Sequence, residues 1–274
     1  MKFAINVPNF GPYADVRFTA DLAREAEEHG WDAFHVWDHI HAEGETGAPT
    51  ADPWILLTAV ALATERIRIG TMVTPVARRR PWKLARETVT LDHLSGGRLT
   101  LGVGLGYPAD LEFTALGEQA DDRVRAEKLD EGLEVLAGLW SGEPFSYDGE
   151  HYQLRDAHFL PRPVQQPRIP IWGARMTGQG PLQRASRWDG VFPLDPVEVF
   201  PTAEAVRQVI EDVRRYRDPA AGTFEVLVPL LLLGDPVGDA ERVAAYEEAG
   251  ATWGHVGALT VEDLREIIAA GPPA

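Results

Sequence analysis

The fold is indicated by the stretch Arg66–Gly106, which reads RIRIGTMVTPVARRRPWKLARETVTLDHLSGGRLTLGVGLG. Residues 67–73 and 98–104 are apolar along most of their length, as strands are when both faces of a parallel sheet are covered. Between them, residues 81–94 follow a helical pattern. The stretch therefore predicts a strand, a helix and a second strand that runs parallel to the first.

The same alternation recurs along the chain. The predicted strands are Lys2–Pro8, Trp31–Trp37, Ile67–Val73, Arg98–Gly104, Ile169–Trp172, Gly190–Pro193, Phe224–Leu233 and Thr252–Val256. The predicted helices are Thr19–His29, Pro53–Thr64, Pro81–Leu94, Asp121–Trp140, Leu182–Arg187, Ala203–Tyr216, Asp239–Ala249 and Val261–Ala270. Eight such units predict an α/β fold, a closed (β/α)8 TIM barrel. A doubly wound open sheet is the alternative, but it usually has a glycine-rich loop after its first strand, unlike Val7–Gly11.

Residues 141–168 interrupt this alternation and are rich in proline, glycine and aromatic residues. We expect a modest insertion here, with a small hairpin around Tyr147–Glu150. The remaining length suffices for eight units and leaves no room for a second domain. We therefore predict a single domain over residues 1–274.

The composition restricts the chemistry available to the protein. Its 274 residues include no cysteine, which excludes disulfides, thiolate nucleophiles and iron–sulfur clusters. There are 42 acidic against 26 basic residues, and the net charge of -16 argues against binding to nucleic acid or to an anionic membrane surface. No window approaches about 18 apolar residues, and the first residues lack the apolar region of a signal peptide. We therefore expect a cytoplasmic protein.

In a barrel of this type the active site forms at the carboxyl ends of the strands, which we call the mouth. The most informative strand end is His35–His41, HVWDHIH. There, His39 is suited to proton transfer near neutral pH and Asp38 to holding the charge state of that histidine. One alternative is that these side chains only satisfy polar groups of a loop. The other is a metal bound by His39 and His41, but most other histidines are not at strand ends, so we predict no metal site.

Two glycine-rich segments also follow predicted strands. Gly102–Gly106 resembles a dinucleotide fingerprint only loosely, and it allows close approach of a flat ring or a packed loop. Gly173–Pro181 offers backbone N–H groups, the Thr177 hydroxyl and the Arg175 guanidinium to a phosphate, with a flexible turn as the alternative. The basic run Arg78–Arg80 precedes a helix, where positive charge is unfavourable, so it indicates either a solvated surface or an anionic ligand.

Several motifs, in order along the chain, point to one family. They are RIRIGT at 66–71, RP at 80–81, LDHLSGGRL at 91–99, LGVGLG at 101–106, GEHY at 149–152, PRPVQ at 161–165 and ASRWDG at 185–190. On these motifs the chain resembles the luciferase-like flavin-dependent monooxygenases and their coenzyme F420-dependent relatives. The resemblance covers nearly the whole chain, and the D-x-L-S-x-G-R run before a glycine-rich strand end is its most specific part.

This resemblance implies a barrel that binds coenzyme F420, or alternatively FMN, in its mouth. It also implies a cis peptide bond near Met72–Val73, in a bulge that backs the cofactor's ring, and a phosphate site at Thr177–Gln179. From the resemblance and from places at strand ends, the residues expected to bind the cofactor are Asn6, Met72, Val73, Thr74, Gly104, Gly106, Gly173, Arg175, Thr177, Gly178 and Gln179.

The pair Asp38–His39 resembles the F420-dependent branch of the family, in which these positions lie close to the cofactor's reactive ring. The resemblance also implies that Glu112, after the fourth strand, assists protonation, and that the protein is a homodimer. The sugar-phosphate dehydrogenases of this branch grip their substrate with lysines, and the only lysines here, Lys2, Lys83 and Lys128, do not match them. A phosphorylated sugar is therefore not the expected substrate.

The leading hypothesis is an oxidoreductase that moves a hydride between F420 and a small organic substrate. His39 is the expected general acid or base, Asp38 positions it, and Glu112 is a second acid. The Asp-His pair and the run Arg78–Arg80, which suits a polyanionic cofactor tail, favour F420. The first alternative is an FMN-dependent monooxygenase that receives FMNH₂ from a partner flavin reductase and activates O₂. A catalytically silent cofactor-binding barrel and a metal hydrolase are the others.

Overall fold

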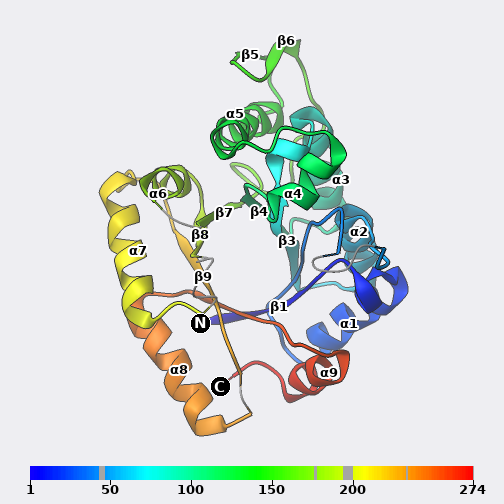
Figure 1. Ribbon diagram of the computed structural model, residues 1–274, viewed down its shortest axis with the longest axis vertical. Helices are drawn as coiled ribbons and strands as arrows, with labels where there is room; N and C mark the ends of the chain where they lie inside the picture. The colour runs from blue at the N-terminus through cyan, green and yellow to red at the C-terminus, as the bar shows by residue number, and fades with distance from the viewer. Residues whose placement is uncertain (43–46, 176–177, 194–199, 233, 274) are drawn as a thin grey trace.

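Eight parallel strands close into a barrel, and helices pack around its outside (Figure 1). The computed structural model describes residues 1–42, 47–175, 178–193, 200–232 and 234–273. Around the barrel the strands follow the order β1, β10, β9, β8, β7, β4, β3 and β2. Their bounds are β1 (Lys2–Val7), β2 (Ala33–Val36), β3 (Arg68–Pro75), β4 (Leu99–Gly104), β7 (Ile171–Arg175), β8 (Gly190–Pro193), β9 (Glu225–Pro229) and β10 (Trp253–Val256). The predicted closed (β/α)8 barrel is confirmed.

The helices lie between successive strands, as the sequence pattern predicts. They are α1 (Val16–Glu28), α2 (Pro53–Ala63), α3 (Pro81–Leu94), α4 (Ala109–Glu112), α5 (Asp122–Trp140), α6 (Gln179–Ser186), α7 (Ala203–Tyr216), α8 (Pro236–Ala249) and α9 (Val261–Ala270). Side chains of Asp15, Asp52 and Asp121 accept backbone N–H groups at the starts of α1, α2 and α5. Within the described ranges, no helix has both the length and the apolar character needed to cross a membrane.

Apart from shifts in the bounds of several elements, two differences from the prediction stand out. Strand β9 ends at Pro229, short of the predicted end at Leu233, which lies outside the described residues. The short helix α4 was not predicted, since four residues are too few to show a helical period. It carries Glu112 at its last position, so a candidate site residue lies on an element that periodicity does not reveal.

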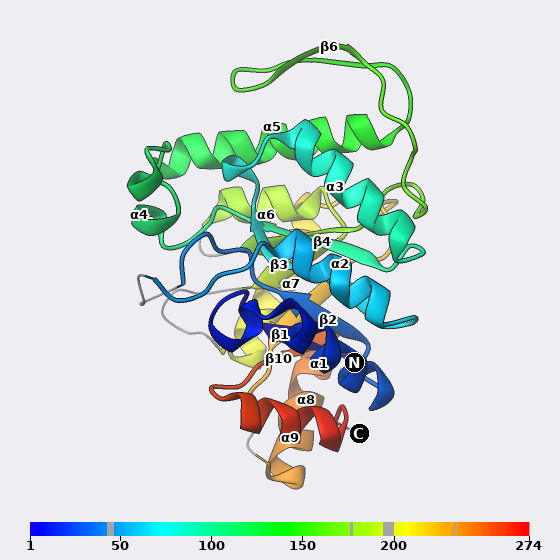
Figure 2. The same ribbon diagram turned by 90° about the vertical axis from the view of Figure 1, so that its right-hand side faces the viewer.

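The predicted insertion is present between α5 and β7. It contains an antiparallel hairpin of β5 (Phe145–Asp148) and β6 (Gln153–Ala157), which projects outward beyond α5 (Figures 1 and 2). The carboxylate of Glu131 on α5 accepts the backbone N–H groups of Glu150, His151 and Tyr152 at 2.9–3.0 Å. One carboxylate thus docks the turn of the hairpin onto the helix.

The inside of the barrel is filled mainly by large apolar side chains but also holds two histidines. The apolar cluster consists of Ala4, Ala33, Met72, Trp172, Phe192, Leu227 and Trp253. Strand register places His35 beside Asn6 and His255 beside Ala4, so both rings face this interior. Burial lowers the pKa of each ring to about 3. Both histidines are therefore neutral at pH 7.

The most specific sequence motif, Asp92–Arg98, lies at the amino ends of the strands, opposite the mouth. The Arg98 guanidinium donates to the carbonyl oxygens of Ala61, Thr64 and Ile67 at 2.9–3.0 Å. The buried Asp92 carboxylate accepts the backbone N–H groups of Val164 and Gln165, at 2.7 and 3.1 Å. The motif therefore holds the barrel together and takes no part in the mouth.

We expect Arg98→Ala to lower the free energy of unfolding by roughly 2 to 4 kcal/mol, because it leaves several carbonyl oxygens without a donor. Urea unfolding followed by circular dichroism measures this loss. The exposed Arg66 is the matched control, and Arg66→Ala should change stability by less than about 0.5 kcal/mol. Equal losses in the two variants would contradict a structural role for the Arg98 contacts.

The lowered pKa of His35 makes stability depend on pH. Between pH 6.5 and 3 the unfolded chain binds a proton on this ring and the native chain does not, so stability falls as pH falls. The slope approaches about 1.4 kcal/mol per pH unit. Between pH 7 and pH 5, His35→Leu should therefore lose up to about 2 kcal/mol less stability than the unchanged chain. Urea midpoints across this range test it, and the exposed His29→Leu should keep the original slope.

Candidate active site

His39 lies just after β2, in the mouth, and its backbone is held by Asn9. The Asn9 side chain donates to the carbonyl oxygens of His39 at 2.8 Å and Ala51 at 2.7 Å, and it accepts the His39 N–H at 3.1 Å. The His39 ring packs against Phe10 and Trp37, with ring centroids 6.0 and 5.7 Å away. A buried amide and two aromatic rings thus set the position of the predicted proton-transfer residue.

Glu112 reaches His39 from the short helix α4 (left in Figure 2). Its Oε1 lies 3.1 Å from His39 Nδ1 and accepts the backbone N–H of Ile40, also at 3.1 Å. The Glu112 side chain is only 1% exposed, whereas that of His39 is 17% exposed. The structure therefore brings together two of the predicted site residues, with the carboxylate behind the ring and the ring nearer to solvent.

The loop that carries Glu112 is held by Arg125 of α5, which the sequence reading missed. Its guanidinium donates to the carbonyl oxygens of Leu105 at 3.0 Å and Gly106 at 2.7 Å. It also lies over the Phe113 ring, 4.8 Å from the centroid. Gly106 has φ +88°, and a Cβ there would meet Phe113 and Pro75, so this predicted cofactor residue is needed for the turn.

Two arginines of the basic run Arg78–Arg80 point inward to buried carboxylates. Arg78 forms ion pairs with both Asp38 and Glu112, and it donates to the Asp38 carbonyl oxygen at 3.0 Å. Arg79 binds the Asp38 carboxylate through two nitrogens, at 3.0 and 2.7 Å. The run therefore compensates internal negative charge, which corrects the prediction that it meets an anionic ligand. Only Arg80 of the three is exposed.

These contacts also change the expected roles of the two acids. The Asp38 carboxylate is engaged by Arg78 and Arg79, and the carboxylate that meets the His39 ring is that of Glu112. It is therefore Glu112, and not Asp38 as expected, whose carboxylate contacts the His39 ring. Because a guanidinium and a backbone N–H both favour its ionised form, Glu112 is suited to accept a hydrogen bond from His39 and not to act as a second acid.

Two buried arginines and two buried carboxylates make up the described charges of this cluster. Burial lowers the pKa of Arg78, partly opposed by Asp38. For Arg79 burial acts in the same direction, but the attraction of Asp38 outweighs it and the pKa lies above its ordinary value. Both side chains stay cationic at any physiological pH, and they face the two carboxylates of Asp38 and Glu112.

Strand β3 forms the bulge expected to back a flat cofactor ring. Its register against β4 shifts between Thr71 and Thr74, and the peptide bond Met72–Val73 is cis. A Cβ at Gly104 would come within 2.8 Å of Val73 Cγ2, so the glycine makes room for the bulge. Gly102 likewise makes room for the Met72 side chain. The half-buried Val73 is thus left as an apolar surface at the mouth, which fits a flat ring.

Other predicted cofactor residues have different surroundings. The Thr74 hydroxyl is buried and donates to Thr71 Oγ1 at 2.9 Å. The outer face of Gly173 packs on Ala185 of α6. Asn6 is buried at the end of β1, and its Oδ1 has no hydrogen-bond partner among the described residues. Asn6 therefore has a side-chain oxygen in the barrel interior that is free to accept a hydrogen bond.

The expected phosphate site lies at the start of α6. Gly178 is the N-cap residue with φ 86°, and no side chain caps the helix, so the backbone N–H groups of its first turn are available to an anion. Gln179 is exposed. Thr177 lies outside the described residues, as does the side chain of Arg175 at the end of β7. The roles of all the predicted cofactor residues remain predictions.

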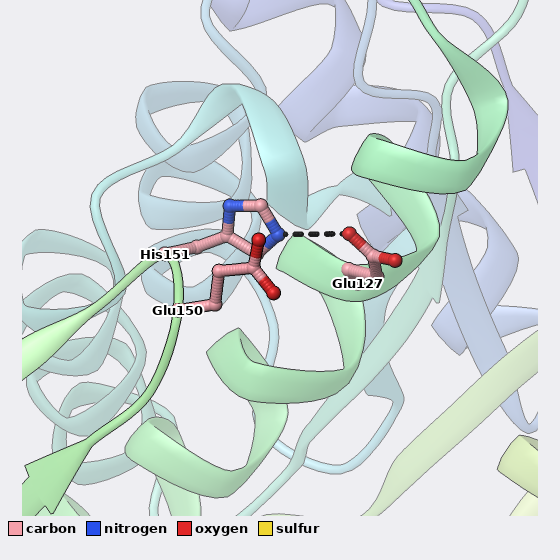
Figure 3. A group of neighbouring side chains, drawn as sticks. All are labelled: Glu127, Glu150 and His151. Atoms are coloured by element: carbon pink, nitrogen blue, oxygen red, sulfur yellow. Dashed lines mark hydrogen bonds and ion pairs between the residues drawn. The ribbon is translucent and has the colours of Figure 1, made fainter.

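A group of possible metal ligands occurs away from the mouth, at the hairpin (Figure 3). It consists of Glu127 on α5 with Glu150 and His151. His151 Nε2 lies 3.1 Å from Glu127, and Arg123 donates to the same carboxylate at 2.7 Å. These hydrogen bonds lower the pKa of Glu127, that from Arg123 most. The contacts explain the group as a second attachment of the hairpin to α5.

The sequence also matches a known family. The sequence profile described as luciferase-like monooxygenase matches residues 1–253. The chain therefore belongs to the luciferase-like monooxygenase family, and it is an oxidoreductase of this class.

The chain is also similar to individual proteins of this kind. The uncharacterized protein Rv0953c of Mycobacterium tuberculosis is 32% identical over 282 residues, covering 86% of this chain and 96% of that protein. The F420-dependent glucose-6-phosphate dehydrogenase of Kineococcus radiotolerans is 38% identical over 174 residues, covering 61% of this chain and 49% of that protein. The structure of an F420-dependent secondary alcohol dehydrogenase in complex with an F420-acetone adduct has a TM-score of 0.80 at 19% identity, covering 99% of this chain and 98% of that chain.

We expect Arg78→Met to lower the free energy of unfolding at pH 8 by about 3 to 5 kcal/mol, because it leaves the buried Glu112 carboxylate without a cation. Without Arg78 the pKa of Glu112 should rise, so the loss should shrink at pH 5.5. Urea unfolding at both pH values measures this. Arg80→Met is the control, since Arg80 is exposed, and a loss as large as that of Arg78→Met would contradict the buried ion pair.

Proposed function

We propose that this protein moves a hydride between coenzyme F420 and a small organic substrate. The proposal is carried by the His39–Glu112 pair, a partly exposed imidazole held from behind by a buried carboxylate. The similarity to proteins named as F420-dependent dehydrogenases supports the choice of cofactor. The bulge at Met72–Val73 and the uncapped start of α6 fit a flat ring and an anionic tail, respectively.

When bound, the deazaflavin supplies the hydride acceptor or donor, and the chain supplies orientation and a proton. In a neutral His39 ring the contact with an ionised Glu112, which can only accept, would place the proton on Nδ1. Nε2 is then the basic nitrogen. It takes the hydroxyl proton of an alcohol as the hydride leaves the adjacent carbon, and in the reverse direction it returns that proton to the carbonyl oxygen.

An FMN-dependent monooxygenase served by a partner flavin reductase is the second candidate. One observation favours it. Arg78 and Arg79 pair with an internal carboxylate, so they do not support binding of the polyanionic tail of F420 over FMN. Relatives named as F420-dependent glucose-6-phosphate dehydrogenases would favour a phosphorylated sugar, but the lysines of this chain do not match a sugar-phosphate grip, so we do not propose that substrate. Lys83 pairs with Glu87, and Lys2 lies over the Trp253 ring, so neither lysine faces the mouth. The homodimer, the single domain and the cytoplasmic location also stay predictions.

Titration of the purified protein with F420 and with FMN tests the proposed cofactor. We expect saturable quenching or enhancement of F420 fluorescence at micromolar concentration and weaker binding of FMN. Micromolar FMN binding with no detectable F420 binding would overturn the proposal and leave the monooxygenase.

The same protein then allows a test of the proton-transfer residue. With a panel of secondary alcohols and F420, His39→Ala should lower the hydride-transfer rate by about 10² to 10⁴ while F420 still binds. The exposed His158→Ala is the control and should keep the original rate. A silent cofactor-binding barrel predicts instead that F420 binds and that no substrate is turned over in any variant.

A further inference from the structure

The barrel interior holds several polar atoms that no neighbour satisfies. Among the described residues, Asn6 Oδ1, both ring nitrogens of His35, Trp172 Nε1 and His255 Nδ1 are buried and have no hydrogen-bond partner. Native proteins rarely leave buried polar atoms unpaired, because each costs folding free energy. Five such atoms in one part of the interior therefore indicate a binding role.

These atoms belong to residues that are neighbours in space. Asn6 and His35 are register partners on β1 and β2, and His255 pairs with Ala4 on the other side of β1. The His35 and Trp172 rings lie 6.1 Å apart at an angle of 85°. The neighbouring ring of His255 also contributes to the lowered pKa of His35. We call Asn6, His35, Trp172 and His255 the polar floor.

The polar floor includes one partly exposed residue. His255 is partly exposed, although Gly254 and Val256 on either side of it in β10 are buried. The register of β10 against β1 turns this ring toward the barrel interior. The next residue on the same face is Gly257, which is exposed and has no side chain to cover the ring.

The chemistry of the polar floor favours an uncharged oxygen group. A neutral imidazole has one donor and one acceptor nitrogen, the indole only donates and the Asn6 oxygen only accepts. Both histidines stay neutral at pH 7, so the floor has no charge with which to bind a phosphate or a carboxylate. Among the side chains that the structure describes, the cations Arg78 and Arg79 at the mouth already pair with carboxylates. A hydroxyl or carbonyl group, which needs partners but no counter-charge, is the group that fits.

We propose that the polar floor binds a hydroxyl or carbonyl oxygen of a small uncharged substrate. This oxygen belongs to the end of the substrate remote from the reacting carbon. His35 lies within β2, whereas His39 lies beyond the end of that strand at Val36, so the polar floor is deeper in the barrel than the His39 ring. As a statement about substrate, the inference rests on the proposed function.

The test uses NMR of the purified protein labelled with ¹³C-histidine and titrated with cyclohexanol in the His39→Ala background, because the single oxygen of cyclohexanol would otherwise be shared between His39 and the polar floor. The His255 signal, assigned from His255→Leu, should shift on titration, and cyclohexanecarboxylate at equal concentration should leave it in place. His255→Leu should weaken cyclohexanol binding at least tenfold, measured on the remaining His35 signal. An unmoved His255 signal, or equal binding of the carboxylate, would overturn the proposal.

Stability measurements separate binding from a structural role. Because an unpaired buried polar atom destabilises the fold, His255→Leu should keep or raise the Tm while it loses cyclohexanol. His255→Asn, which keeps a donor and an acceptor, should retain part of the binding. The exposed His158→Leu is the matched control and should change neither property. A large fall of Tm in both His255 variants would assign the ring a structural role and overturn the proposal.

Titration of the same samples with F420 separates a failure of the proposed cofactor from a failure of the polar floor. Cyclohexanol binding without F420 binding would leave the polar floor standing and overturn the proposed cofactor. F420 binding with no response of either histidine signal to cyclohexanol would overturn the polar floor alone.

Discussion

Arg78 is the residue on which the arrangement of the mouth depends. Its guanidinium joins Asp38, after β2, to Glu112, on α4, and its own backbone follows β3. Both carboxylates are almost fully buried, so each needs a cation to offset its lost hydration. Three strand ends are thereby held together by charge. The His39–Glu112 contact, the feature that gives the site its chemistry, forms within this network.

The glycines of β4 are needed for the β3 bulge, and the bulge in turn forms part of the proposed cofactor site. Gly102 and Gly104 leave space for the side chains of Met72 and Val73, and without that space the β3 bulge has no room. The bulge then presents Val73 at the mouth. The glycines thus act on the cofactor site indirectly, through the strand they accommodate.

Much of the fold was predictable, because apolar runs and helical periods are local properties of the chain. The site was predictable only as a set of residues. His39 and Glu112 were identified, but their contact joins positions 73 residues apart, which no local pattern reports. The run Arg78–Arg80 indicated a solvated surface or an anionic ligand, whereas Arg78 and Arg79 pair with the chain's own carboxylates, Asp38 and Glu112. Arg125 was missed, since a single arginine has no periodic signal.

The sequence alone determined the barrel, the family resemblance and the supply of chemistry: no thiol, three lysines and a histidine at a strand end. Its most specific motif, Asp92–Arg98, turned out to hold the amino ends of the strands together. Tertiary structure decided which charges meet, which carboxylate orients His39 and which polar atoms of the interior stay unpaired. The reason is physical: pairing and burial depend on side chains brought together by barrel closure, whereas periodicity and composition are already present in the chain.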